Sequence, residues 1–106
     1  MDKIIGALKA FRDERDWTQF HNAKDLALAL SIEAGELLEA FLWKDAGAAN
    51  PEKVKEELAD VFAFAFLLAD KYDFKVEEIV MEKLKKNAEK YPTDKAKGNA
   101  KKYTEL

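Results

Sequence analysis

The sequence predicts a small all-α protein with the architecture of a four-helix bundle, and three observations carry that prediction. Its 106 residues include only 4 Gly and 2 Pro, far fewer turn residues than β folds require. Hydrophobic residues make up 48 % and charged residues 37 %, a balance typical of helices with one buried and one solvated face. Apolar residues recur at three- and four-residue spacing along most of the chain.

The first half of the chain predicts two helices joined by a loop. Residues 2–15 keep apolar side chains at helical spacing, so a first helix is expected there. Residues 17–24 lack such a stripe and contain two aromatic residues and the single His, which indicates a connecting segment. Residues 25–43 have a broad apolar face and predict the second helix.

The second half predicts two more helices and a polar tail. Asn50 and Pro51 form a preferred N-cap and first-turn pair for a third helix over residues 51–72. The fourth helix is expected over residues 75–90 and ends before Pro92. We therefore expect one domain over residues 1–106, whose last part, residues 95–106, is a polar and basic C-terminal tail.

Composition excludes several classes of function. The 18 Lys and Arg residues against 21 Asp and Glu residues give a net charge of −3, which argues against a nucleic-acid partner. The absence of Cys excludes disulfides, thiol catalysis and thiolate metal sites. The N-terminus does not resemble a signal peptide, and the longest apolar run is too short to span a bilayer. The expectation is a cytoplasmic protein that does not engage membranes.

That longest apolar run, residues 61–69, is apolar on every side of the third helix. A helix of this kind is normally buried all round. Two interpretations remain open from the sequence: the helix is the centre of the bundle, or a second subunit covers part of it in a homo-oligomer.

Acidic pairs on the second and third helices are the main chemical signal. Glu33 and Glu36 share one helix face, as do Glu57 and Asp60. If the two helices are antiparallel about the break near residue 47, both pairs lie at nearly the same height. Four inward carboxylates would need protons or cations, and oxygen ligands without His or Cys favour Mg²⁺, with Mn²⁺ also possible. A solvated acidic face paired with Lys is the alternative.

The whole pattern resembles the all-α nucleoside triphosphate pyrophosphatases, the MazG-like group, and within them the dCTP pyrophosphatase-like branch. That family binds Mg²⁺ through E-x-x-E, a spacer and E-x-x-D, which here are Glu33 to Glu36 and Glu57 to Asp60. Four further stretches are similar: Arg15 to His21 (RDWTQFH), Phe41 to Lys44 (FLWK), Lys83 to Pro92 with its Asn87 and Tyr91, and Lys97-Gly98 followed by Lys102 to Leu106 (KYTEL).

The resemblance implies the activity. It implies an Mg²⁺-dependent hydrolase that converts a (d)NTP and water to a (d)NMP and pyrophosphate. The implied substrate is dCTP or a modified deoxycytidine triphosphate, and the implied role is house-cleaning of the nucleotide pool. It also implies a homotetramer built as a dimer of dimers.

Site residues follow from the resemblance together with their chemistry. Glu33, Glu36, Glu57 and Asp60 are the expected metal ligands and catalytic carboxylates, and one of them or Glu39 would orient the attacking water. Residues able to stack on a base, hydrogen-bond the nucleotide or neutralise phosphate are the expected substrate contacts. These are Trp17, His21, Trp43, Lys83, Asn87, Tyr91, Lys102 and Tyr103.

Two interpretations from other classes of protein compete with the interpretation as an enzyme. One is a non-catalytic helical oligomerisation module, and the other is a metal-binding regulatory module without turnover. Both account for helices and an acidic cluster, but neither accounts for the two Trp residues, Lys83, Asn87 and the KYTEL ending occurring together.

Overall fold

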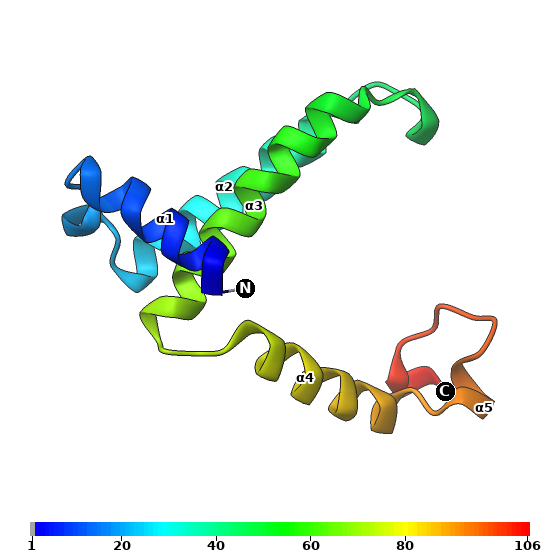
Figure 1. Cartoon of the computed structure of the whole chain (residues 1–106). Coiled ribbons are helices and arrows are strands. Elements are labelled where there is room, and N and C mark those ends of the chain that lie inside the picture. The colour runs from blue at the N-terminus through cyan, green and yellow to red at the C-terminus, as the bar shows by residue number, and fades with distance from the viewer. Residues whose placement is uncertain (1) are drawn as a thin grey trace. The chain divides into compact units, whose positions relative to one another are not determined.

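A computed structural model describes residues 2–106, and all regular structure in that range is helical. The helices are α1 (Asp2–Glu14), α2 (Ala23–Glu39), α3 (Pro51–Lys71), α4 (Val76–Lys90) and the short α5 (Thr93–Ala96). Three 3₁₀ turns, Thr18–Phe20, Ala46–Ala48 and Tyr103–Glu105, lie between or after them. The all-α prediction is confirmed, and each of the four predicted helices is present, although α2 begins and ends earlier than the predicted residues 25–43 (Figure 1).

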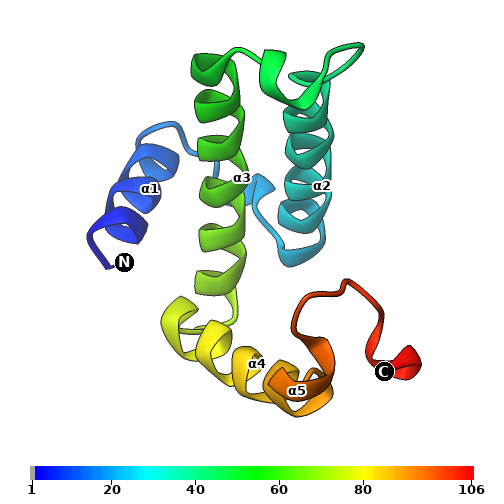
Figure 2. The ribbon, with the colours of Figure 1, turned by 90° about the vertical axis from the view of Figure 1, so that its right-hand side faces the viewer.

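The chain divides into two compact units, one ending at Asp73 and the other comprising Phe74–Leu106. In the first unit α2 and α3 form an antiparallel hairpin, side by side over most of their length (Figure 2). Helix α1 packs against α3, and an ion pair between Lys9 Nζ and Asp70 Oδ2, 3.6 Å apart, links the two helices. This unit contains both predicted acidic pairs.

The buried core of the hairpin is small. Its buried apolar residues are Leu26 and Ala40, together with Leu67 and Ala69 on α3. Within the predicted apolar run, Phe62 is exposed while its neighbours are half-buried or buried. Helix α3 is therefore not covered on all sides by the chain itself.

Both helices of the hairpin begin at an asparagine cap. Asn22 Oδ1 accepts a hydrogen bond from the backbone N–H of Asp25, at 2.9 Å. Asn50 Oδ1 accepts one from the backbone N–H of Glu52, at 3.0 Å. Each cap satisfies a donor that the first helical turn leaves without a partner, so the caps define where the acid-bearing helices start.

The second helix is shorter than predicted, because it ends at Glu39 and not at residue 43. From Ala40 onward the backbone N–H groups bond to carbonyls three residues earlier, which tightens the helix into turns. Trp43 then adopts a positive φ of 60°, a left-handed conformation that a right-handed helix cannot contain. The broad apolar face extends past the helix end, and this is why the pattern suggested a longer one.

The second unit is built on α4, and its C-terminal residues fold back onto the end of that helix. Tyr103 packs edge-on against Tyr91, with ring centroids 6.1 Å apart. Lys90 Nζ lies 4.9 Å from the centroid of the Tyr103 ring, a cation–π distance. The tail predicted from the sequence thus carries local structure of its own.

Across residues 2–106 there is no helix whose length and apolar character suffice to cross a membrane.

Replacing Asn50 by Ala should lower the free energy of unfolding by about 1 kcal/mol, because the backbone N–H of Glu52 loses its acceptor. Urea unfolding followed by circular dichroism measures this change. Asn50→Ser, which keeps a capping oxygen, should retain most of the stability, and equal losses in the two variants would contradict the capping role.

Candidate active site

The α2–α3 hairpin brings together three of the four predicted carboxylates. Glu33 and Glu36 on α2 and Glu57 on α3 each offer one oxygen, and these oxygens all lie within 4.8 Å of one another. The fourth, Asp60, lies one turn after Glu57 on α3 and is close enough for its charge to act on Glu33. We call these four residues the acidic cluster.

Burial of Glu33 and Glu57 makes the acidic cluster electrostatically unfavourable, while Glu36 and Asp60 are exposed. Glu57 is only 7 % exposed, and Glu33 is half-buried. Burial and the hydrogen bond and negative charge of Glu36 raise the pKa of Glu33 to about 7, with smaller contributions from Asp60 and Glu57. Glu33 Oε2 and Glu57 Oε2 are buried and have no hydrogen-bond partner among the described residues, which is costly for carboxylate oxygens.

Lys53 is the cation of the acidic cluster, and the sequence analysis did not single it out. Its Nζ lies 2.8 Å from Glu57 Oε1, one helical turn away on α3. This hydrogen bond is the main reason that the pKa of Glu57 is lowered and that of Lys53 is raised. The i,i+4 spacing of the two residues was the signal available in the sequence.

The donor set of the acidic cluster fits a hard divalent cation. It consists of carboxylate oxygens without nitrogen or sulfur ligands, the kind of set that Mg²⁺ and Mn²⁺ prefer. The two buried oxygens without partners, on Glu33 and Glu57, are atoms that a cation would satisfy. The cluster is therefore compatible with a divalent metal site.

A cavity of about 410 Å³ in the same unit opens beside the acidic cluster. Glu33 and Asp60 form part of its wall, so cluster and cavity are continuous. Two predicted substrate contacts, Trp17 and His21, also line it. The remaining lining residues, which the sequence analysis did not assign to a site, are Leu8, Phe11, Arg12, Ala63, Phe64 and Leu67.

Aromatic rings give the cavity flat apolar walls. Phe11 and Trp17 meet edge to face with centroids 5.8 Å apart, and His21 meets Phe64 in the same way at 6.4 Å. Burial is the main cause that lowers the pKa of His21, assisted by the positive charges of Arg12 and Lys71. The lowered pKa favours the neutral imidazole, and its Nδ1 is buried without a partner among the described residues.

The other predicted substrate contacts are not among the residues that line this cavity. Trp43 is 94 % exposed and does not line the cavity. The remaining five belong to the second unit: Lys83 and Asn87, one turn apart on α4, then Tyr91, Lys102 and Tyr103. Within that unit Tyr91 and Tyr103 are in contact, as described above.

Comparison with known proteins identifies the family. The model of the MazG-like family matches residues 28–106, a range that includes the whole acidic cluster. The chain belongs to the MazG-like family. The family resemblance expected from the sequence is thereby confirmed.

Curated relatives of this MazG-like chain include dCTP pyrophosphatase 1 of Homo sapiens and of Rattus norvegicus, each 38 % identical over 104 residues. These alignments cover 91 % of the chain but 61 % of each relative, so the chain spans about three fifths of their length. Among solved structures it is similar to a pyrophosphatase from Archaeoglobus fulgidus DSM 4304, with a TM-score of 0.81 and 36 % identity. That match covers 87 % of this chain and 92 % of the other.

In metal-free buffer, stability should fall between about pH 5 and pH 8 because of Glu33. Its pKa rises from 4.5 in the unfolded chain to about 7 in the folded one, so its contribution is full below pH 4.5 and is lost as the pH rises through 7. His21, whose pKa is lowered, acts in the opposite direction. The measurement is therefore the difference in unfolding free energy between wild type and Glu33→Gln, from urea titrations with EDTA at several pH values.

The wild type should lose stability relative to Glu33→Gln as the pH rises over that range. Parallel pH profiles for the two proteins would show that Glu33 is not held protonated by its neighbours.

Proposed function

We propose that this protein is a Mg²⁺-dependent nucleoside triphosphate pyrophosphohydrolase that converts a (d)NTP and water to a (d)NMP and pyrophosphate. The observation that carries the proposal is the continuity of the acidic cluster with an aromatic cavity: Glu33 and Asp60 belong to both. Phosphates need cations held by carboxylates, and a base needs flat apolar walls. The similarity to pyrophosphatases supports the same reaction.

In the proposed reaction the acidic cluster holds the cation through Glu33, Glu36, Glu57 and Asp60. When bound, Mg²⁺ supplies neutralisation of the phosphate charge. The oxygen of a water molecule bonds to the α-phosphorus, and the bond from that phosphorus to the bridging oxygen of the leaving pyrophosphate breaks. A carboxylate of the cluster, or the exposed Glu39 one turn after Glu36, orients the water and accepts its proton.

The aromatic cavity is the proposed base site. Trp17 offers its indole face to a base, and its edge-to-face contact with Phe11 holds the ring in place. His21 adds a buried Nδ1 that has no partner in the described chain. Trp43 remains a proposed base contact; because it is 94 % exposed and does not line this cavity, we propose that it contributes to a site on another copy of the chain.

The proposed substrate is dCTP or a modified deoxycytidine triphosphate, in house-cleaning of the nucleotide pool, and the similarity to dCTP pyrophosphatase 1 supports it. The second unit would supply cations and hydrogen bonds to the phosphates and sugar. Its proposed contacts are Lys83, Asn87, Tyr91, Lys102 and Tyr103. The back-folded C-terminal segment, held by the contact of Tyr91 with Tyr103, supports a joint role for these last residues.

The proposed active form is a homo-oligomer, a tetramer built as a dimer of dimers. Exposed large apolar residues on the hairpin support it, among them Phe62 on α3 and Ile32 and Leu38 on α2. Such apolar surface on a small protein is typical of an interface, and identical subunits usually assemble with closed symmetry.

Glu36→Gln and Asp60→Asn should each lower pyrophosphate release at least a hundred-fold, because each removes a proposed metal ligand while keeping the side-chain size. The assay is pyrophosphate release from a panel of dNTPs with Mg²⁺, and EDTA should abolish it. Glu56→Gln, an exposed acid on the same helix, is the matched control and should stay active. Activity that survives EDTA, or two fully active variants, would contradict the site assignment.

Reaction in ¹⁸O-water should place the label in the monophosphate, because the proposed attack is at the α-phosphorus. Mass spectrometry of the separated products measures this. Label found only in pyrophosphate would mean attack at the β-phosphorus, and formation of a diphosphate with inorganic phosphate would contradict the proposed reaction.

A further inference from the structure

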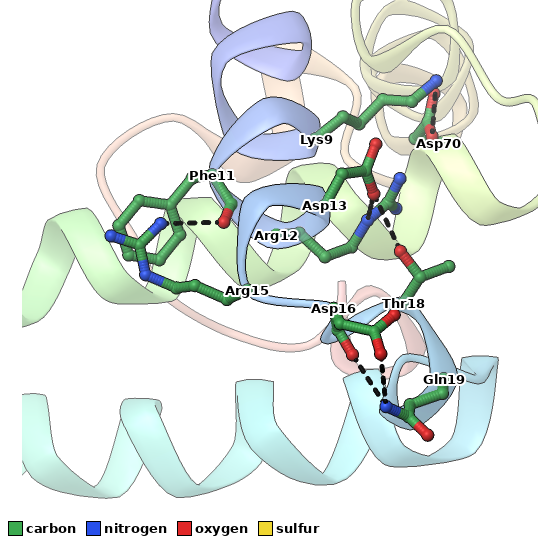
Figure 3. Close-up of polar contacts among 9 residues, drawn as sticks. All are labelled: Lys9, Phe11, Arg12, Asp13, Arg15, Asp16, Thr18, Gln19 and Asp70. Atoms are coloured by element: carbon green, nitrogen blue, oxygen red, sulfur yellow. Dashed lines mark hydrogen bonds and ion pairs between the residues drawn. The ribbon is translucent and has the colours of Figure 1, made fainter.

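Arg12 lines the aromatic cavity, and neither the metal site nor the proposed base contacts use it. Its side chain is 15 % exposed. Nε donates a hydrogen bond to Asp13 Oδ1 at 2.9 Å, and Thr18 Oγ1 donates to the same oxygen at 2.8 Å (Figure 3). Asp13 therefore fixes the Nε edge of the guanidinium and links it to the turn that follows Trp17.

The Nη edge of the Arg12 guanidinium has no hydrogen-bond partner among the described residues. An arginine carries five N–H donors, and the bond to Asp13 consumes the single one on Nε. Across residues 2–106 the two Nη nitrogens of Arg12 donate no hydrogen bond. The two Nη nitrogens are not among the buried atoms without a partner in the described residues, so they face accessible space, and their donors are available to a ligand in the cavity that Arg12 lines.

Arg12 lies at the end of the cavity that is distant from the acidic cluster. Asp60 and Leu67, both in the cavity wall, are two turns apart on α3, which is about 10 Å of helix. The ion pair of Lys9 with Asp70 holds α1 beside the last turns of α3.

This position favours contact with a base over contact with phosphate. A nucleotide with its phosphates at the acidic cluster directs its base along the cavity toward Arg12. Two Nη–H groups of an arginine pair best with two adjacent acceptors. Cytosine offers N3 and O2, and guanine offers N7 and O6, whereas thymine and adenine alternate donors with acceptors along the corresponding edges.

We propose that Arg12 is the specificity-determining residue of the base site, and that its Nη edge selects a base with two adjacent acceptors, cytosine or guanine. The inference rests on the proposed function, because it takes the cavity as the base site. It assigns to Arg12 a role that packing alone would not require.

The test is calorimetric titration of the full-length protein with dCMP, dGMP, dTMP and dAMP in the presence of Mg²⁺. Wild type should bind dCMP or dGMP at least ten-fold more tightly than dTMP and dAMP, the range of a bidentate arginine–base contact. Arg12→Met should bring that ratio close to one. Arg12→Lys should also lose most of it, because an ammonium keeps the charge but not the planar pair of donors.

Arg15→Met is the matched control. Arg15 lies on the outer side of the cavity wall, with its guanidinium carbon 3.6 Å from the centroid of the Phe11 ring, and it does not line the cavity. Its loss changes the net charge as Arg12→Met does, and the affinity ratio should persist. Melting temperatures of all variants separate a loss of folding, which weakens all four nucleotides alike, from a loss of discrimination.

An unchanged ratio in Arg12→Met, or a parallel loss for all four nucleotides, would overturn the role of Arg12. In either case pyrophosphate release by the wild type would leave the proposed function intact. Failure of the wild type to release pyrophosphate from any dNTP would overturn the proposed function, while a wild type that releases pyrophosphate but binds none of the four monophosphates, or binds all four equally, would overturn the role of Arg12 alone.

Discussion

Packing of α2 against α3 is the constraint on which the rest of this molecule depends. Apolar burial along the hairpin, at residues such as Leu26 and Leu67, drives the two helices together, and their acidic faces come together with them. This proximity of carboxylates is unfavourable. The pKa of Glu33 is raised to about 7, and the charge of Glu57 is balanced by its ion pair with Lys53. Such a locally unfavourable arrangement, supported by a favourable scaffold, is typical of functional sites.

Helix α3 also organises the cavity. Asp60, Phe64 and Leu67 follow one another at helical spacing on one face of α3. This helix therefore presents to the cavity first a carboxylate, then an aromatic ring and then an aliphatic side chain. Helix α1 closes the opposite side through Phe11 and Arg12. Along α3 the cavity wall therefore changes from charged to apolar over about two helical turns, and Arg12 on α1 adds a cation beside the apolar end, which matches a ligand with a phosphate end and a base end.

The sequence predicted the helices and the acidic pairs because both depend on local periodicity and on one short connection. Glu33, Glu36 and Glu57 meet because antiparallel helices joined by a brief turn leave little freedom of register. The sequence analysis did not single out Lys53 or Arg12. Both lie at ordinary helical positions, and only the folded structure shows that Lys53 pairs with a buried carboxylate and that Arg12 lines a cavity. The early end of α2 at Glu39 is followed by tightened turns from Ala40 and by the positive φ of Trp43, neither of which hydrophobic periodicity encodes.

Charge balance at the acidic cluster bears on how a nucleotide would enter. Four carboxylates face one lysine, Lys53, which is already engaged with Glu57, so the cluster repels a bare triphosphate whenever Glu33 is ionised. Coulomb repulsion between like charges is strong at a poorly solvated site. For the proposed reaction, the form of substrate that the cluster can accept is therefore its complex with a divalent cation. The cationic edge of Arg12 does not relieve this repulsion, because it lies at the other end of the cavity, and it is left free to distinguish one base from another.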